Sequence, residues 1–214
     1  MPDLSILPGC ALPTAAELDA WYGEGHYAYL DSPQAMSLYK TVANAALRFG
    51  CRTVLDVGCY HAHPLRFLPP GSIEAYLGID LCTPALRRDR AAYANRREAN
   101  FRYSDWNSFP SQNKDRSFCM IYFGGVFYYL KNRLSFIDGY IRAFSPRIVV
   151  IQDLAATDLG AVTSAYRLRE RHWFDMDFHV DASEWDAGWD ATTIRERQII
   201  VLETGMSRAP SALT

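Results

Sequence analysis

Four short, uninterrupted apolar runs constrain the fold of this chain more than any other feature of its sequence. They are CRTVLDVGC (51–59), AYLGIDL (75–81), SFCMIYFGG (117–125) and RIVVIQDL (147–154). Runs of this length, rich in Val, Ile, Leu and aromatic residues, are typical of strands that are buried on both faces of a parallel sheet. The segments that separate the runs can form helices, at 64–68, 84–97 and 132–144. This alternation indicates right-handed crossovers and an open α/β sheet.

Three further segments complete the predicted sheet. NFRYS (100–104) is short and follows the second helix, whereas WFDMDFHVD (173–181) alternates apolar and polar residues with period two, and IRERQIIVLE (194–203) is another strand candidate. The last two predict an antiparallel pair. We therefore expect an α/β fold with an open, mostly parallel, doubly wound sheet of seven strands and an antiparallel closing strand.

The N-terminal quarter has a different pattern. Residues 15–49 predict helix in two stretches: TAAELDAWY (14–22), where Thr14 and Glu17 form a capping box, and SPQAMSLYKTVANAALRFG (32–50), which ends on Gly50. We expect a helical segment or lid over 1–50, an α/β domain over 51–204, and a flexible tail over 205–214.

Composition excludes several classes of function. The 214 residues carry a net charge of −2, which gives no general attraction for nucleic acid or an anionic membrane. No apolar run approaches the roughly 20 residues that span a bilayer. The five cysteines have no C-x-x-C spacing, so neither a zinc site nor a disulfide framework is indicated, and a reducing, cytoplasmic setting is predicted.

Acids or glycines follow four of the predicted strands. The first strand leads into Asp56 and Gly58, and Asp80 comes 22 residues after Gly58. The short third strand is followed by Asp105-Trp106, and the fourth by Gly124-Gly125. Because ligands of open α/β sheets bind at the carboxyl ends of the strands, these residues predict a binding site. An acid about 20 residues past the glycine turn is suited to a pair of ribose hydroxyls.

In this order and spacing, the motifs LDVGCYHA, YLGID, YSDW and IYFGGVFYYL resemble those of class I S-adenosylmethionine-dependent methyltransferases. The resemblance covers roughly residues 50–155 and extends more loosely to 203. It implies a Rossmann-like fold, S-adenosylmethionine as cofactor and methyl transfer to a small molecule through an O, N or C nucleophile.

The resemblance also implies roles for individual residues. Asp56, Gly58, Cys59 and Tyr60 would lie along the methionine part of the cofactor. Asp80 would accept hydrogen bonds from the ribose, and Leu81 would pack on the adenine. Asp105 and the backbone of Trp106 would contact the adenine edge, and Gly124 would line the methionine end.

The glycine loop departs from the family pattern D-x-G-x-G-x-G, because Tyr60 and Ala62 replace the second and third glycines. Such loops tolerate a larger residue where the backbone keeps a negative φ, so we expect a negative φ at Tyr60. His61 is expected to point outward. Pro64 opens the next helix, and Pro69-Pro70 ends it after about five residues. The N-terminus of this short helix would still face the carboxylate of the cofactor.

Plain structural roles compete with several of these assignments. Asp80 could cap the next helix, and Asp105 could be an ordinary turn residue. His61 and His63 are an i, i+2 pair in a loop, which is more often structural than metal-binding, so no metal site is predicted. An acidic strand face (Asp175, Asp177, His179, Asp181) could hold a hard cation but equally suits an exposed face. The arginines of 84–97 predict a solvated helix face.

The candidate catalytic residues are His172, Tyr128 and His26, with Asp153 as a further candidate base. The aromatic residues of 21–29 predict a lid over a small-molecule substrate. Three alternatives remain: a different reaction in the same cofactor pocket, such as a cyclisation or rearrangement; a nicotinamide-dependent oxidoreductase, which the loop disfavours; and a non-catalytic binding partner. A homodimer is compatible with the sequence.

Overall fold

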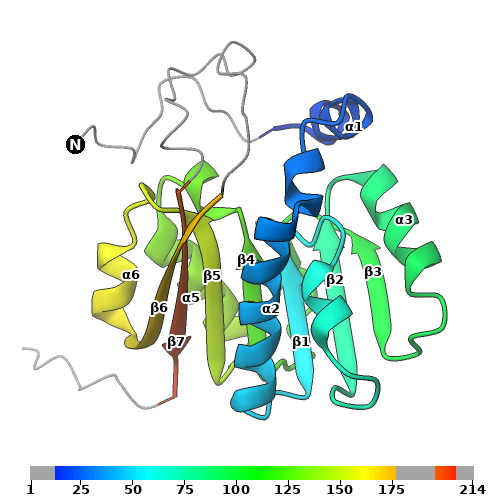
Figure 1. The fold of residues 1–214 in the computed structure, drawn as a ribbon. Coiled ribbons are helices and arrows are strands. Elements are labelled where there is room, and N and C mark those ends of the chain that lie inside the picture. Colours follow the sequence, from blue (N-terminus) through cyan, green and yellow to red (C-terminus); the bar gives the residue numbers. More distant parts are fainter. Residues whose placement is uncertain (1–12, 177–195, 206–214) are drawn as a thin grey trace, which may run out of the picture.

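A single seven-stranded sheet forms the centre of the computed structural model, which describes residues 13–176 and 196–205 (Figure 1). The strand order is β3-β2-β1-β4-β5-β7-β6, and β7 runs antiparallel to both of its neighbours. The strands are β1 (Thr53–Val57), β2 (Ala75–Asp80), β3 (Ala99–Tyr103), β4 (Met120–Gly124), β5 (Ile148–Leu154), β6 (Arg167–Asp175) and β7 (Glu196–Glu203). The predicted fold class is confirmed, including the antiparallel closing strand.

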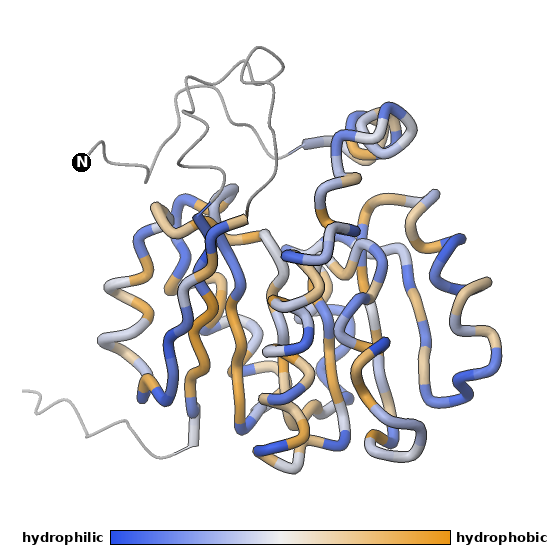
Figure 2. The backbone as a smooth tube through the Cα atoms, viewed as in Figure 1, coloured by the Kyte–Doolittle hydropathy of each residue, from blue (hydrophilic) through white to orange (hydrophobic). Residues whose placement is uncertain are grey.

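Alternate residues of the central strands enter two separate hydrophobic layers. Val54 of β1 and Val150 of β5 pack in one layer, whereas Leu55 and Ile151, their neighbours in sequence, pack in the other. All seven residues of β5 are buried, as the continuous apolar run predicts. Figure 2 shows β5 hydrophobic along most of its length and β6, at the sheet edge, largely hydrophilic. A polar edge strand discourages pairing with another chain.

Helices cover both faces of the sheet. The α-helices are α1 (Ala15–Gly23), α2 (Pro33–Arg48), α3 (Thr83–Ala92), α4 (Phe109–Gln112), α5 (Arg133–Phe144) and α6 (Gly160–Ala165); the 3-10 helices are η1 (Ala28–Asp31), η2 (His63–Phe67) and η3 (Phe127–Tyr129). Residues of α2, η2 and α3 belong to the first layer, and residues of α4, α5 and α6 to the second.

The boundaries of several elements differ from those predicted. The helical segment 15–49 contains α1 and α2 as predicted, with the 3-10 helix η1 between them; the chain turns at 24–27, and Ser32 caps α2 through the backbone N–H of Ala35. The segment 84–97 is helical only to Ala92. Strand β6 begins at Arg167, earlier than predicted, and residues 177–181 of the acidic run lie outside the described residues.

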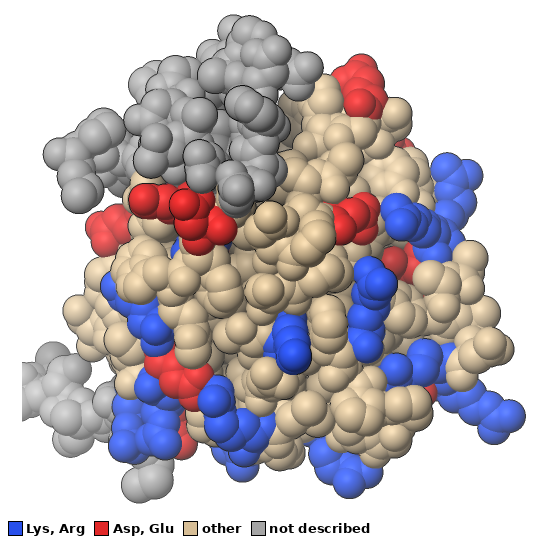
Figure 3. Space-filling model, viewed as in Figure 1, with Lys and Arg blue, Asp and Glu red and all other residues tan. Residues whose placement is uncertain are grey.

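The distribution of surface charge, the free thiols and the length of the helices describe the rest of the molecule. Basic and acidic side chains are interspersed on the described part of the face that Figure 3 shows. Cys51 and Cys119 lie side by side where β1 and β4 begin, with their sulfurs 2.7 Å apart, and both are free thiols. No helix within 13–176 and 196–205 is long and apolar enough to cross a membrane.

Candidate functional site

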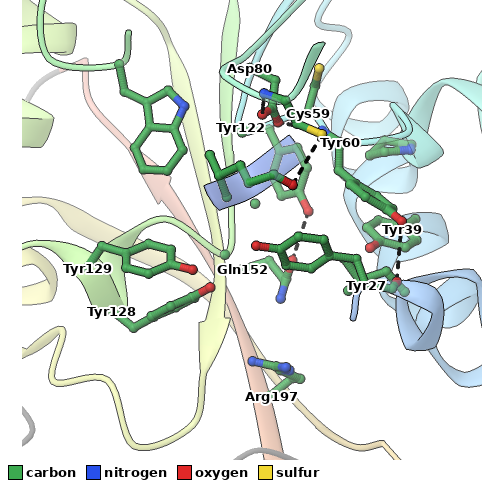
Figure 4. Close-up of a pocket in the computed structure, with 18 of the residues that line it drawn as sticks. Tyr27, Tyr39, Cys59, Tyr60, Asp80, Tyr122, Tyr128, Tyr129, Gln152 and Arg197 are labelled. Atoms are coloured by element: carbon green, nitrogen blue, oxygen red, sulfur yellow. Dashed lines mark hydrogen bonds between the residues drawn. The ribbon is translucent and has the colours of Figure 1, made fainter. Parts of the chain in front are cut away.

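A cleft opens at the carboxyl edge of the sheet, beside the junction of β1 and β4 (Figure 4). From β1 the chain proceeds to β2 and β3 on one side, and from β4 to β5 on the other, so the turns that follow β1 and β4 diverge. The cleft has a volume of about 770 Å³, counted to its solvent-open mouth. The residues that line it are Leu18, Tyr27, Tyr29, Leu30, Tyr39, Gly58, Cys59, Tyr60, Pro64, Asp80, Cys82, Trp106, Tyr122, Gly124, Gly125, Tyr128, Tyr129, Gln152 and Arg197.

The loop after β1 keeps the backbone conformation of a glycine-rich loop without its glycines. Gly58 has φ +73°, and Tyr60 and Ala62 follow with φ +45° and +44°. The expected negative φ at Tyr60 is therefore wrong. Left-handed backbone costs a residue with a side chain about 1–2 kcal/mol, so the surrounding contacts must hold two strained residues in place.

Gly58 is the residue of this loop that cannot carry a side chain. A Cβ at this position would lie 2.8 Å from Cγ2 of Val126 and 3.2 Å from the carbonyl oxygen of Gly124. The loops after β1 and β4 therefore touch at the floor of the cleft. Gly124 is restricted too, because a Cβ there would lie 3.0 Å from the hydroxyl oxygen of Tyr122.

Asp80 fixes the loop from the end of β2. Its Oδ2 accepts a hydrogen bond from the backbone N–H of Tyr60 at 2.9 Å, and its Oδ1 accepts one from Cys82 at 2.8 Å. Burial raises the pKa of this carboxyl group, which these backbone donors partly offset. Each carboxylate oxygen can accept more than one hydrogen bond, so Asp80 retains capacity toward hydroxyl groups of a ligand in the cleft.

Asp56 lies beneath the cleft rather than in its lining. The side chain is fully buried, and Oδ2 accepts a hydrogen bond from the hydroxyl of Tyr76, while Oδ1 has no hydrogen-bond partner. Burial raises the pKa of Asp56 to about 7, against the effect of the Tyr76 hydrogen bond, with the nearby Asp80 carboxylate adding to the increase.

The strand-end pair Asp105-Trp106 is divided between two roles. Trp106 lines the cleft and is 5% exposed, and its indole N–H has no hydrogen-bond partner. Asp105 instead accepts hydrogen bonds from the backbone N–H groups of Asn107 and Ser108, at 3.2 and 3.1 Å, as an ordinary turn residue does. Leu81 is partly buried against Leu18 and does not line the cleft.

Of the three candidate catalytic residues, the structure brings only Tyr128 to the cleft. His172 lies outside the cleft, because it is on edge strand β6 and β7 separates β6 from β5. Its Nε2 pairs with Oε2 of Glu170 at 3.0 Å. His26 follows α1 and pairs with the exposed Glu24 at 3.3 Å. Asp153 accepts the backbone N–H of Phe127 at 2.7 Å and positions the loop that carries Tyr128.

His61 points inward, contrary to the expectation that it is exposed. It is 4% exposed, with its ring centroid 3.9 Å from that of Tyr60 and its Nε2 2.9 Å from Nη1 of Arg88. Nε2 of His63 lies 3.2 Å from Oδ1 of Asp31, without hydrogen-bond geometry. Burial lowers the pKa of both histidines to about 4, so they are neutral at pH 7. No group of three metal-binding side chains occurs in the part of the chain that the structure describes.

Several cleft residues were not predicted from the sequence, among them the polar residues Tyr39, Tyr122, Gln152 and Arg197. The hydroxyl of Tyr122 donates to Oε1 of Gln152 at 3.1 Å across β4 and β5. Polar residues inside runs as apolar as these strands were the available signal, since a buried polar group needs a partner. Tyr27 and Tyr29 belong to the aromatic segment that was predicted as a lid.

Comparisons with known proteins place this architecture. No family model matches the chain, and no curated protein matches it by sequence. Among solved structures, the [4+2]-cyclase SpnF matches with a TM-score of 0.65 at 13% identity, over 90% of this chain and 96% of that one. The N-methyltransferase NodS from Bradyrhizobium japonicum WM9 matches with a TM-score of 0.62 at 16% identity, over 82% and 98%. This chain has the fold of class I S-adenosylmethionine-dependent methyltransferases.

A further protein with the methyltransferase fold is the plantazolicin methyltransferase BamL, with a TM-score of 0.58 at 13% identity over 90% of this chain and 96% of that one. NodS and BamL have each been crystallised with S-adenosylhomocysteine. At these identities the likeness concerns the fold.

Proposed function

We propose that this protein binds S-adenosylmethionine in the cleft and transfers its methyl group to a small molecule. The observation that carries the proposal is the joint position of Asp80, the left-handed loop 58–62 and the glycines that follow β4, at the junction of β1 and β4. Asp80 would hold the ribose hydroxyls. Gly58 and Gly124 line the cleft and would lie along the methionine part, and Trp106 contributes an unpartnered buried N–H.

When bound, S-adenosylmethionine supplies a methyl group on a positively charged sulfur. The protein's own part is to hold an acceptor in line and to exclude water, which can account for a large share of the acceleration. The cleft is suited to this, because seven of its lining residues are tyrosines: Tyr27, Tyr29, Tyr39, Tyr60, Tyr122, Tyr128 and Tyr129. Burial raises the pKa of Tyr128 well above its usual range, so it stays protonated and serves as a donor and as an aromatic face.

A second candidate is a cyclisation or rearrangement in the same pocket. No histidine is among the described residues that line the cleft, and burial raises the pKa values of Tyr122 and Tyr128, so these two hydroxyls stay protonated at pH 7. Such a cleft favours reactions in which the protein removes no proton, namely transfer to an amine or a preformed anion, or a pericyclic ring closure. The match to the [4+2]-cyclase SpnF supports this candidate.

Binding is tested first by calorimetry and thermal unfolding with S-adenosylmethionine, S-adenosylhomocysteine and NADH in separate experiments. Saturation at about 100 times the dissociation constant should stabilise the protein by about 2.7 kcal/mol. A shift with the two sulfur compounds alone is expected. A shift with NADH alone would point to an oxidoreductase, and no shift at all would leave a binding protein without cofactor.

Substitution of Asp80 tests the role of its carboxylate. Asp80→Asn should weaken S-adenosylhomocysteine binding by about 1–3 kcal/mol, because an uncharged amide is a poorer partner for two hydroxyls. The matched control is Asp115→Asn, an exposed acid before β4, which should leave binding unchanged. Equal affinities of Asp80→Asn and the wild-type protein would remove Asp80 from the site.

A further inference from the structure

Arg197 is a buried cation at the end of the cleft remote from Asp80. It lies near the start of β7, and because β7 is antiparallel, this start is at the carboxyl edge of the sheet, opposite Leu154 of β5. The residue is 4% exposed and lines the cleft. Figure 4 shows Arg197 at one end of the cleft and Asp80 at the other, with Tyr128 and Tyr129 along the side between them.

No described carboxylate forms an ion pair with this guanidinium. Among the described residues its Nε has no hydrogen-bond partner, and its Nη2 donates to the hydroxyl of Tyr29 at 3.5 Å. The guanidinium carbon lies 5.8 Å from the centroid of the same tyrosine ring. The buried acid of β5, Asp153, interacts electrostatically with Arg197 but forms no ion pair with it. Its carboxylate accepts hydrogen bonds from the backbone N–H groups of Phe127 and Leu154 and from the hydroxyl of Thr157, at 2.7, 2.8 and 2.7 Å.

Within the described residues the guanidinium is therefore buried with an unused donor at Nε, and a ligand that supplies an opposite charge would stabilise such a group. The planar guanidinium matches a carboxylate in a two-point hydrogen-bonded contact. The rings of Tyr128 and Tyr129, whose centroids are 4.0 Å apart, supply an aromatic wall beside it. The remaining charged residue that lines the cleft among those described, Asp80, lies at the far end and would repel an acid placed there.

We propose that Arg197 binds the carboxylate of the acceptor substrate, so that the protein selects small aromatic acids. The inference rests on the proposed function and refines it. S-adenosylmethionine also carries a carboxylate, in its methionine part. The position of Arg197 at the end of the cleft away from Asp80 favours the acceptor as the source of the anion, and the experiment separates the two.

The test uses the full-length protein saturated with S-adenosylhomocysteine and two probes of equal size, 4-hydroxyphenylacetate and its uncharged amide, 4-hydroxyphenylacetamide. Calorimetry measures each probe against wild type, Arg197→Gln, Arg197→Lys and the exposed control Arg116→Gln. The affinity of each variant for S-adenosylhomocysteine alone is measured in parallel, and thermal unfolding verifies that each variant is folded.

We expect wild type to bind the acid at least tenfold more tightly than the amide, and Arg197→Gln to abolish that preference. Arg197→Lys should restore part of it, because it keeps the charge and loses the planar fork. S-adenosylhomocysteine affinity should stay within twofold in every variant. Absence of binding by the acid, equal binding of acid and amide, or an unchanged preference in Arg197→Gln would overturn the inference and leave the proposed function standing.

A tenfold fall in S-adenosylhomocysteine affinity in Arg197→Gln would also overturn it, by assigning the guanidinium to the cofactor's own carboxylate. Absence of S-adenosylhomocysteine binding by wild type would instead refute the proposed function, and the inference with it.

Discussion

At the scale of the residue, the loop after β1 shows how a glycine motif can lose its glycines and keep its shape. Tyr60 and Ala62 adopt the left-handed backbone that glycine would favour, because Asp80 holds the N–H of Tyr60 and the carbonyl oxygen of Cys59 accepts the N–H of Ala62 at 2.7 Å. The sequence indicates where the loop lies but not these dihedral angles, since they are set by contacts with β2. Gly58 remains glycine because two atoms of the neighbouring loop fill the space of a Cβ.

Replacement of Gly58 by alanine should be among the most damaging single changes. Left-handed backbone and a Cβ 2.8 Å from Val126 together predict a loss of about 2–4 kcal/mol of unfolding free energy. Urea denaturation measures it. Gly71→Ala is the control. Its φ is also positive, at +78°, but the added Cβ would have no non-neighbouring atom within 4 Å, so only the backbone cost of about 1–2 kcal/mol applies. Equal losses in the two variants would mean that the contact with Val126 relaxes freely.

At the scale of the element, the N-terminal helix α1 contributes to the cleft but buries few side chains against the rest of the domain. Helix α1 buries only Leu18, against Cys82 and Ala85 of the α3 region. Its predicted capping box is present, with the N–H of Glu17 bonded to Oγ1 of Thr14 at 3.2 Å. A helix of 9 residues with one buried side chain depends on specific contacts to stay docked.

One such contact joins α1 to the start of α3, where Oδ1 of Asp19 accepts the backbone N–H of Thr83 at 2.9 Å. Asp19→Ala should cost about 1 kcal/mol of docking energy and weaken S-adenosylhomocysteine binding roughly fivefold. The melting temperature should change little, because the main hydrophobic layers do not include α1. Hydrogen exchange of residues 14–23 and calorimetry measure the two effects. Asp19→Asn keeps an acceptor and should behave as wild type; an equal defect in both variants would argue against this contact.

At the scale of the whole molecule, the architecture could be predicted from the sequence better than the residues that line the cleft. The apolar runs determine which segments become strands, and the acids and glycines at their ends indicate the edge that carries the site. The position of His172 outside the cleft could not be predicted, because one residue's place in a strand pattern does not reveal that β7 inserts between β5 and β6. Arg197 was missed because its burial results from pairing with both neighbouring strands.

The free energy of unfolding should depend on pH, because two buried carboxyl groups have raised pKa values in the folded protein. Burial raises the pKa of Asp89 to about 9 and that of Asp56 to about 7. Between the ordinary carboxyl value and these values the folded state holds protons that the unfolded chain has released, so unfolding free energy falls as pH rises. The lowered pKa values of His61 and His63 act in the opposite direction, but only between about 4 and 6.5.

Stability should therefore decline between about pH 6.5 and 9, and Asp89→Asn should flatten the decline. The variant's advantage over wild type should grow by up to about 1.4 kcal/mol per pH unit in this range. Urea denaturation at a series of pH values measures it, with Asp115→Asn as the exposed control. Parallel curves for wild type and Asp89→Asn would show that Asp89 does not change protonation in this range.

The thiols of Cys51 and Cys119 have a practical consequence. Cys51 precedes β1 and Cys119 precedes β4, 68 residues apart along the chain, and their contact lies at the opposite edge of the sheet from the cleft. A two-electron oxidant would convert the two thiols into a disulfide with loss of two hydrogens, and this bond would link the segments before β1 and β4 away from the cleft. A preparation stored without reductant would then contain the thiol form and the disulfide form, which differ little in mass but differ in melting temperature. This difference would be a chemical source of variation between batches.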